Sequence, residues 1–211
     1  MKIAIIGTGR MGKALSKCLA EKFDSVILAG RNTEKTKQVA SEINHHKLIP
    51  LEIEDAIIQA KLVIPTLWFK DEKEFASKYR EQLEGKIYLN ISVPFDETFN
   101  DFELPFGISA AETIQAIVPE THFVAGFKNT FWTVFESPVQ PNGLKSDVLI
   151  TSDSGKLADE IIKLFEPLPF RFVNAGPISE NRTIERMTLL SRNISKRIGF
   201  YPRVSWSVWG F

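Results

Sequence analysis

The chain has 211 residues, which is enough for one domain with a modest extension and ample for a hydrophobic core. Lys and Arg together number 26 and Asp and Glu together number 26, so the formal net charge is zero. This balance gives no bulk field to attract nucleic acid or an anionic membrane. No apolar run approaches the roughly 20 residues that span a bilayer, and we expect no signal peptide. The single Cys18 cannot form an internal disulfide, so we expect a cytoplasmic protein.

The first twelve residues predict a nucleotide-binding turn. The apolar run Ile3–Ile6 is typical of a buried parallel strand. Gly7, Gly9 and Gly12 follow in the spacing G-x-G-x-x-G. The first permits a sharp turn, the second leaves room for a pyrophosphate, and the third lets a helix lie close to the strand. The N–H groups and the dipole of that helix favour phosphates. A purely structural turn is the alternative, and the strand–turn–helix context argues against it.

The end of the second expected strand indicates which dinucleotide binds. A site that prefers NAD usually has an acidic residue about 20 residues beyond the glycines. Here Gly30 and Arg31 occupy that place, and Asn32 and Lys35 follow. A guanidinium binds a 2′-phosphate through paired, charge-assisted hydrogen bonds and can stack on adenine. We therefore predict NADP(H) as the cofactor.

Strands and helices alternate along the chain. The expected strands cover residues 3–6, 26–29, 48–51, 62–65, 87–91 and 122–125, and the expected helices cover 9–22, 33–43, 53–59 and 70–83. Thr33 is the predicted cap of the second helix, and Ser109 with Glu112 predicts a capping box. A strand at 147–151, a helix at 153–165, a strand at 170–174 and a long helix at 179–198 complete the pattern. The tail holds Tyr201, Trp206, Trp209 and Phe211, and we expect it to dock on its own core or on a partner subunit.

This alternation predicts an α/β fold with a doubly wound parallel sheet (the Rossmann NAD(P)-binding fold) and a small C-terminal α/β extension that ends in a long helix. We expect an NADP-binding domain at residues 1–135 and an extension at 136–211 packed on the same core. Ligands bind beyond the carboxyl ends of parallel strands. Residues 66–68 and 92–94 should therefore face the cofactor.

Taken together, these motifs resemble the deazaflavin-dependent NADP reductases, meaning the NADPH:coenzyme F420 oxidoreductases and their dinucleotide-binding relatives. The resemblance runs through nearly the full length, and it is carried by residues 7–12, 30–32, 64–68, 109–112 and 174–182. It implies that NADP lies across the carboxyl edge of the sheet and passes hydride directly to a second cofactor. By position, Arg31 would hold the 2′-phosphate, and Pro65, Val93 and Pro94 would line the nicotinamide. Such a transfer needs no catalytic side chain, and we expect neither one nor a metal site.

The candidate cofactor-binding residues are Gly7, Thr8, Gly9, Arg10, Met11, Gly12, Gly30, Arg31, Asn32, Lys35, Pro65, Thr66, Leu67, Trp68, Val93 and Pro94. The second substrate stays open between deazaflavin F420, a flavin, a quinone and another small acceptor. Family members that use the deazaflavin tend to have a His-Thr-Ile-Pro-like stretch after the sixth strand, whereas residues 127–132 here are Phe-Lys-Asn-Thr-Phe-Trp. A dinucleotide sensor without turnover and an imine reductase-like enzyme are the alternative functions. The direction of hydride transfer and a homodimer also stay open.

Overall fold

The structure is a computed structural model that describes residues 1–139 and 143–210. Its larger sheet has six strands, in the spatial order β3 (Leu48–Leu51), β2 (Val26–Ala29), β1 (Ile3–Ile6), β4 (Leu62–Pro65), β5 (Ile87–Asn90) and β6 (His122–Ala125). The central strand β1 runs parallel to both of its neighbours, and Ile3 lies in register with Val26 on one side and Leu62 on the other. The predicted doubly wound parallel sheet is confirmed.

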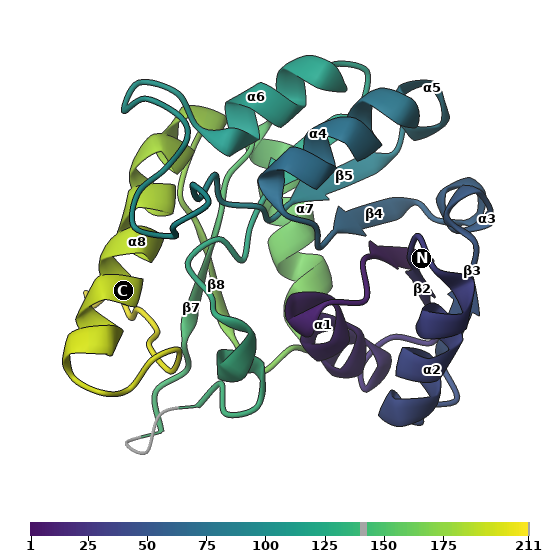
Figure 1. Cartoon of the computed structure of the whole chain (residues 1–211), viewed down its shortest axis with the longest axis horizontal. Helices are drawn as coiled ribbons and strands as arrows, with labels where there is room; N and C mark the ends of the chain where they lie inside the picture. Colours follow the sequence, from purple (N-terminus) through teal and green to yellow (C-terminus); the bar gives the residue numbers. More distant parts are fainter. Residues whose placement is uncertain (140–142, 211) are drawn as a thin grey trace. The chain divides into compact units, whose positions relative to one another are not determined.

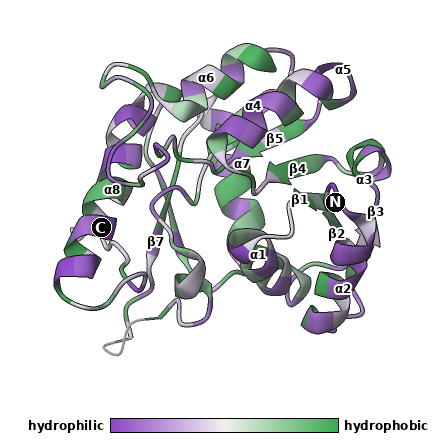
Figure 2. Ribbon diagram, in the orientation of Figure 1, coloured by the Kyte–Doolittle hydropathy of each residue, from purple (hydrophilic) through white to green (hydrophobic). Residues whose placement is uncertain are grey.

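The aliphatic runs form strands that are covered on both faces. Every residue of β1, β2, β4 and β5 is buried, and Figure 2 shows the strands as mainly apolar against more polar helices. Helices α1 (Arg10–Ala20) and α2 (Thr33–Ile43) contact each other on one face of the sheet (Figure 1). The other face is covered by α3 (Ile53–Gln59), α4 (Phe69–Lys78) and α5 (Arg80–Leu83), as right-handed crossovers require.

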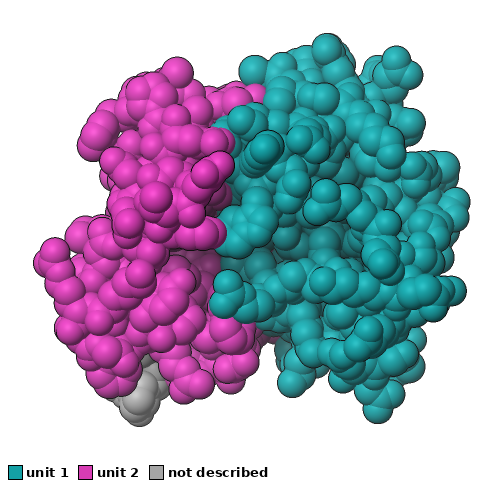
Figure 3. Space-filling view, viewed as in Figure 1, with its two compact units in different colours: residues 1–92, 114–123 teal, residues 93–113, 124–211 magenta. Residues whose placement is uncertain are grey.

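Residue contacts divide the chain into two compact units, coloured separately in Figure 3. The first unit comprises residues 1–92 and 114–123, and the second comprises residues 93–113 and the chain from 124 onward. The division passes through α6 (Ala110–Ile117) and through β6. The domains expected from the sequence, 1–135 and 136–211, stay a prediction.

The second unit has its own small sheet and its own core. Strands β7 (Asp147–Ile150) and β8 (Arg171–Asn174) pair in parallel, and α7 (Gly155–Phe165) connects them. Phe127 is buried among four aromatic rings with centroids at most 6.2 Å away, those of Phe135, Phe165, Phe170 and Phe172. The short 3₁₀ helix η2 (Ile178–Glu180) leads into the long helix α8 (Asn181–Arg197), while a second one, η1 (Trp132–Phe135), follows β6.

The C-terminal tail docks on the second unit. The indole N–H of Trp206 donates to Ser191 Oγ at 2.6 Å, and the carbonyl oxygen of Trp206 accepts from the backbone N–H of Asp147 at 2.9 Å. The backbone N–H of Val208 donates to Asp147 Oδ2 at 2.6 Å. Docking of the tail on its own core is thereby confirmed for these residues, and Phe211 lies outside the described residues.

Two element boundaries differ from the sequence prediction. The cap of α2 is Asn32, one residue before the predicted Thr33, and its side chain accepts from the backbone N–H of Lys35 at 2.8 Å. The helix expected at 70–83 is divided at Tyr79, whose φ and ψ of −107° and 17° interrupt the helix between α4 and α5. The Tyr79 hydroxyl donates to Glu54 Oε1 on α3 at 2.7 Å, a tertiary contact that local helix propensity cannot anticipate.

Candidate functional site: the β1–α1 turn and the carboxyl edge of the sheet

The turn between β1 and α1 has the geometry that its glycine spacing predicts. Gly7 has φ +128°, a conformation that strains any residue with a Cβ. At Gly12, an added Cβ would lie 2.0 Å from the carbonyl oxygen of Gly7, so the helix can approach the strand only without a side chain there. The hydroxyl of Thr66, just beyond β4, donates to the carbonyl oxygens of Ile6 and Gly7 at 3.1 and 3.2 Å. The end of β4 therefore holds this turn in place.

Gly9 differs from the other two glycines because the space beside it is open. No described atom outside its immediate chain neighbours lies within 4 Å of a Cβ built on Gly9. Gly9 is also the N-cap of α1. It has no side chain that could accept a hydrogen bond from the N–H groups in the first turn of the helix. Exposed Arg10 and half-buried Met11 begin that turn. Open space at a helix start rich in N–H donors fits the pyrophosphate of a dinucleotide.

The end of β2 packs against the glycine-rich turn. A Cβ on Gly30 would lie 3.1 Å from Thr8 Cγ2 and 3.1 Å from Thr36 Oγ1, so glycine permits close approach of the two loops. The structure thus brings Thr8 and Gly30 together, as a site that crosses both strand ends requires. The Asn32 side chain caps α2, which gives it a structural role beside its predicted cofactor role.

Arg31, the predicted 2′-phosphate ligand, lies in solvent beside a carboxylate. Its side chain is 78% exposed, and Arg31 Nη1 lies 3.6 Å from Asp71 Oδ1 in the first turn of α4. Lys35, exposed on α2, adds a second cation to the same loop region. Sequence reasoning missed Asp71, because it lies 40 residues from Arg31 in a helix whose charged residues read as a solvated face.

The residues that follow β4 lie at the carboxyl edge of the sheet. Pro65 is the buried last residue of β4 and lies in register with Ile6. Leu67 is half-buried, and Trp68 is the N-cap of α4 with 56% of its surface exposed. Thr66 connects this edge to the glycine-rich turn, and that residues 66–68 face the cofactor stays a prediction.

Val93 and Pro94 follow β5 along the chain and open the second compact unit. Val93 is half-buried and Pro94 is buried. Their predicted place along the nicotinamide stays a prediction.

A buried polar network lies at the end of β5, and sequence reasoning did not predict it. Glu72, in the first turn of α4, is fully buried. The Tyr88 hydroxyl donates to Glu72 Oε1 at 2.8 Å, and Asn90 Nδ2 donates to the same oxygen at 3.0 Å and to Ser92 Oγ at 3.2 Å. Burial, and after it the Glu72 carboxylate, raise the pKa of Tyr88 well above its usual value, so the phenol remains a donor. Polar residues at every second position of an otherwise apolar strand were the available signal.

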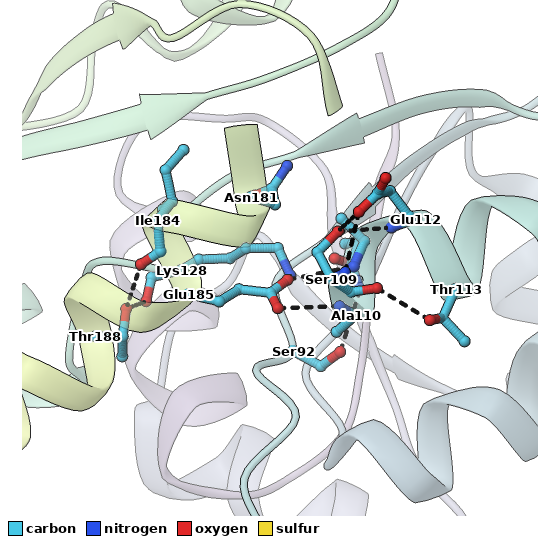
Figure 4. A network of polar contacts seen from close by, with 12 residues as sticks. Ser92, Ser109, Ala110, Glu112, Thr113, Lys128, Asn181, Ile184, Glu185 and Thr188 are labelled. Carbon is cyan, nitrogen blue, oxygen red and sulfur yellow. Dashed lines mark hydrogen bonds and ion pairs between the residues drawn. The ribbon is translucent and has the colours of Figure 1, made fainter. Parts of the chain in front are cut away.

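The second unit contains a buried ion pair, shown in Figure 4. Lys128 Nζ donates to Glu185 Oε1 at 2.9 Å, and the two side chains are 1% and 2% exposed. The Glu185 carboxylate also accepts from the backbone N–H groups of Ala110 and Ala111, at 3.0 and 3.3 Å. It therefore caps the start of α6 from α8. The Thr188 hydroxyl on α8 donates to the carbonyl oxygen of Lys128 at 2.6 Å. This bond joins α8 to the loop that follows β6.

The predicted capping box at the start of α6 is present beside that pair. Ser109 Oγ donates to Glu112 Oε2 at 2.7 Å, and the Ser109 backbone N–H donates to the same oxygen at 3.0 Å. Burial alone would raise the pKa of Glu112, but the hydrogen bonds from Arg182 and Ser109 bring that pKa below its usual value. Two carboxylates from different elements thus hold this helix start.

Comparison with known proteins shows what this chain is similar to. Residues 2–94, which carry the glycine-rich turn and the ends of β2, β4 and β5, match the family model described as NADP oxidoreductase coenzyme F420-dependent. The F420-dependent NADP reductase of Methanocaldococcus jannaschii is 28% identical over 204 residues, which cover 90% of each chain. The chain is similar to the coenzyme F420-dependent NADP reductases. The resemblance drawn from the sequence motifs is therefore confirmed.

Solved structures agree with this relationship at the level of the fold. A crystal structure from Arthrobacter sp. FB24, described as a candidate F420-dependent NADP reductase, superposes with a TM-score of 0.84 at 22% identity, over 94% of this chain and 95% of that one. An imine reductase from Myxococcus stipitatus in complex with NADP⁺ superposes with a TM-score of 0.70 at 13% identity, over 94% of this chain and 63% of that one. Within the described residues, no helix is long and apolar enough to cross a membrane.

Proposed function

We propose that this protein transfers hydride directly between NADP(H) and a second cofactor or small acceptor, with deazaflavin F420 or a flavin as the expected partner. The broader class follows from its relatives: it is an NADP-dependent oxidoreductase. The open space at Gly9, at the start of α1, carries the proposal, because it matches what a pyrophosphate needs from this turn.

Each part of the carboxyl edge has a proposed role. The turn from Gly7 to Gly12 and the start of α1 would hold the pyrophosphate, with Thr66 fixing the turn. Arg31 would pair with the 2′-phosphate, and Pro65 would lie along the nicotinamide. When bound, NADPH would supply a hydride, that is, two electrons together with one proton. The transfer would leave NADP⁺ and a reduced acceptor. The side chains align the reacting groups and exclude water.

The loop after β6 bears on the choice of acceptor. Phe127, Lys128 and Asn129 are all buried. Asn129 Nδ2 donates to the carbonyl oxygen of Asp147 at 2.7 Å, and Asn129 Oδ1 accepts from the backbone N–H of Leu149 at 3.2 Å. These three side chains therefore build the core of the second unit. We propose that acceptor specificity comes from neighbouring positions, and a quinone remains an alternative acceptor.

Single-turnover transfer of a deuterium label tests the proposed function. NADPH labelled at the hydride-donating carbon is mixed with the protein and either F420 or FMN, and the reduced acceptor is analysed by mass spectrometry. With F420 we expect the label on carbon in the reduced deazaflavin, without exchange with solvent. With FMN the label would reach a ring nitrogen and exchange with water, so the expected result there is stoichiometric loss of the FMN absorbance at a rate that the deuterium lowers. NADPH binding with no turnover by any acceptor would favour a dinucleotide sensor, and reduction of a cyclic imine alone would favour an imine reductase-like enzyme.

Arg31→Ala should weaken NADP(H) binding by about tenfold to a hundredfold, the loss expected for one charge-assisted contact to phosphate, and hardly change NAD(H) binding. Calorimetric dissociation constants for the four dinucleotides measure this. Lys37→Ala is the matched control, because Lys37 is another exposed cation of α2 and pairs with Glu34 at 3.1 Å. If NAD(H) binding fell as much as NADP(H) binding, Arg31 would not be recognising the 2′-phosphate.

We also propose that the chain forms a homodimer through α8. Leu190, Ile194 and Ile198 are exposed and lie four residues apart, so they form an apolar stripe along this helix and its end. Sedimentation equilibrium should give twice the mass of one chain. A single-chain mass at micromolar concentration would contradict the dimer. A cytoplasmic location and the lack of a nucleic-acid partner stay predictions.

A further inference from the structure

Arg31, the proposed ligand of the 2′-phosphate, has a carboxylate beside it in the protein itself. Arg31 Nη1 lies 3.6 Å from Asp71 Oδ1, and the two side chains are 78% and 32% exposed. Arg31 lies in the loop between β2 and α2, and Asp71 belongs to the first turn of α4. A solvent-accessible aspartate carries a negative charge at neutral pH. The guanidinium that would recognise NADP(H) is therefore paired with an anion of its own chain.

Arg171 shows how a fixed guanidinium is held in this protein. Arg171 Nε and Nη2 donate to Asp147 Oδ1 and Oδ2, both at 2.6 Å, and the Asp147 side chain is fully buried. Such a bidentate pair holds both side chains in one geometry. At 3.6 Å, the Arg31–Asp71 ion pair is longer than a hydrogen bond, and the Arg31 side chain is mostly exposed. Asp71 therefore attracts the Arg31 guanidinium without fixing its orientation.

The loop after β2 is surrounded by charges of both signs. The Thr33 hydroxyl donates to Glu52 Oε1 at 2.5 Å, and Glu52 directly follows β3. Lys35, on α2, is exposed. Glu52 and Asp71 thus bring two carboxylates from other elements to the loop that holds Arg31 and Lys35. A phosphate that binds this loop meets negative as well as positive charges.

We propose that Asp71 is a specificity-determining residue that lowers the preference of the site for NADP(H) over NAD(H), because it competes with the 2′-phosphate for Arg31. This inference rests on the proposed function, with the adenosine ribose at the end of β2. The 2′-phosphate of NADP(H) must draw the guanidinium away from Asp71 or share it with Asp71. NAD(H) has only a hydroxyl at that place and leaves the ion pair intact. The free energy of the ion pair is therefore lost only when NADP(H) binds.

Dissociation constants for NADPH and NADH, measured by calorimetry on the wild type and on Asp71→Asn, test the inference. Asparagine keeps the size of the side chain and removes its charge. We expect NADPH to bind about threefold to fivefold more tightly, the scale of one exposed ion pair, while NADH binding is unchanged. Adenosine 2′,5′-bisphosphate, which has the 2′-phosphate but no nicotinamide, should show the same gain as NADPH, and AMP should show none.

Two further variants separate competition for Arg31 from a general effect of charge. Glu52→Gln is the matched control, because it removes the same charge beside the same loop, where Glu52 accepts from Thr33. It should leave both dissociation constants unchanged. In the Arg31→Ala background, Asp71→Asn should no longer tighten NADPH binding, because the cation for which Asp71 competes is absent. This double-mutant cycle isolates the coupling between the two side chains.

The outcomes separate this inference from the proposed function. Unchanged NADPH binding in Asp71→Asn, or weaker binding because Asp71 positions the guanidinium, overturns the competition while the wild type still binds NADPH. An equal gain from Glu52→Gln, or an equal gain without Arg31, also overturns it, because charge alone would then explain the effect. A wild type that binds neither dinucleotide overturns the proposed function, and this inference with it. A selective gain for NADPH that requires Arg31 supports the inference.

Discussion

Gly9→Val is expected to abolish NADP(H) binding while the chain remains folded. Gly9 has φ −75° and ψ −174°, which residues with a Cβ adopt readily, and no described atom lies within 4 Å of the added Cβ. The valine side chain would instead fill the open space in which the pyrophosphate is proposed to lie. Calorimetry should detect no heat of NADPH binding, and the far-UV circular dichroism spectrum should match that of the wild type.

Gly12→Val is the matched comparison for this prediction. Its Cβ would lie 2.0 Å from the carbonyl oxygen of Gly7 and 2.7 Å from Thr66 Oγ1, so the turn and the helix would have to separate. We expect this variant to lose its folded far-UV spectrum. NADPH binding retained by Gly9→Val would contradict the placement of the pyrophosphate at this turn.

Glu185→Ala should destabilise the second unit by about 3–5 kcal/mol, as expected when one partner of a buried ion pair is removed. The substitution takes away the carboxylate that faces the buried Lys128 ammonium, and it removes the acceptor for the backbone N–H groups of Ala110 and Ala111. Urea unfolding followed by tryptophan fluorescence measures the change in the free energy of unfolding.

Two variants show whether burial of the charge causes that loss. Arg182→Ala removes a partly exposed partner of Glu112 at the same start of α6, so its effect should be much smaller. Lys128→Met combined with Glu185→Leu replaces both charges with apolar groups and should recover most of the lost stability. A loss from Glu185→Ala no larger than that from Arg182→Ala would contradict the importance of the buried pair.

The strands and the glycine-rich turn could be predicted because their signals are local. The apolar run Ile3–Ile6 predicts a buried strand. The three glycines that follow predict a tight turn, because glycine adopts backbone conformations that strain other residues. The capping box of Ser109 and Glu112 was predictable for the same reason, since both residues lie within one helical turn. The family resemblance rested on these local motifs together with residues 30–32, 64–68 and 174–182.

The buried polar groups could not be predicted because their partners are distant in the chain. Glu72 and Tyr88 are 16 residues apart, and Lys128 and Glu185 are 57 residues apart. Hydrophobic periodicity places an element against the core, but it does not say which polar side chains meet across elements. Glu72 lies in a charged segment of the sequence, so its pattern predicts a solvated side chain, whereas the structure buries it completely.

Calorimetric titration of the apo protein with NADPH and with NADH tests the central claim most directly, that the turn after β1 and the loop after β2 form an NADP(H) site. We predict tight binding of NADPH and weak binding of NADH, followed by binding of F420 or FMN only when NADP⁺ is present. No binding of either dinucleotide would contradict this claim and the function built on it.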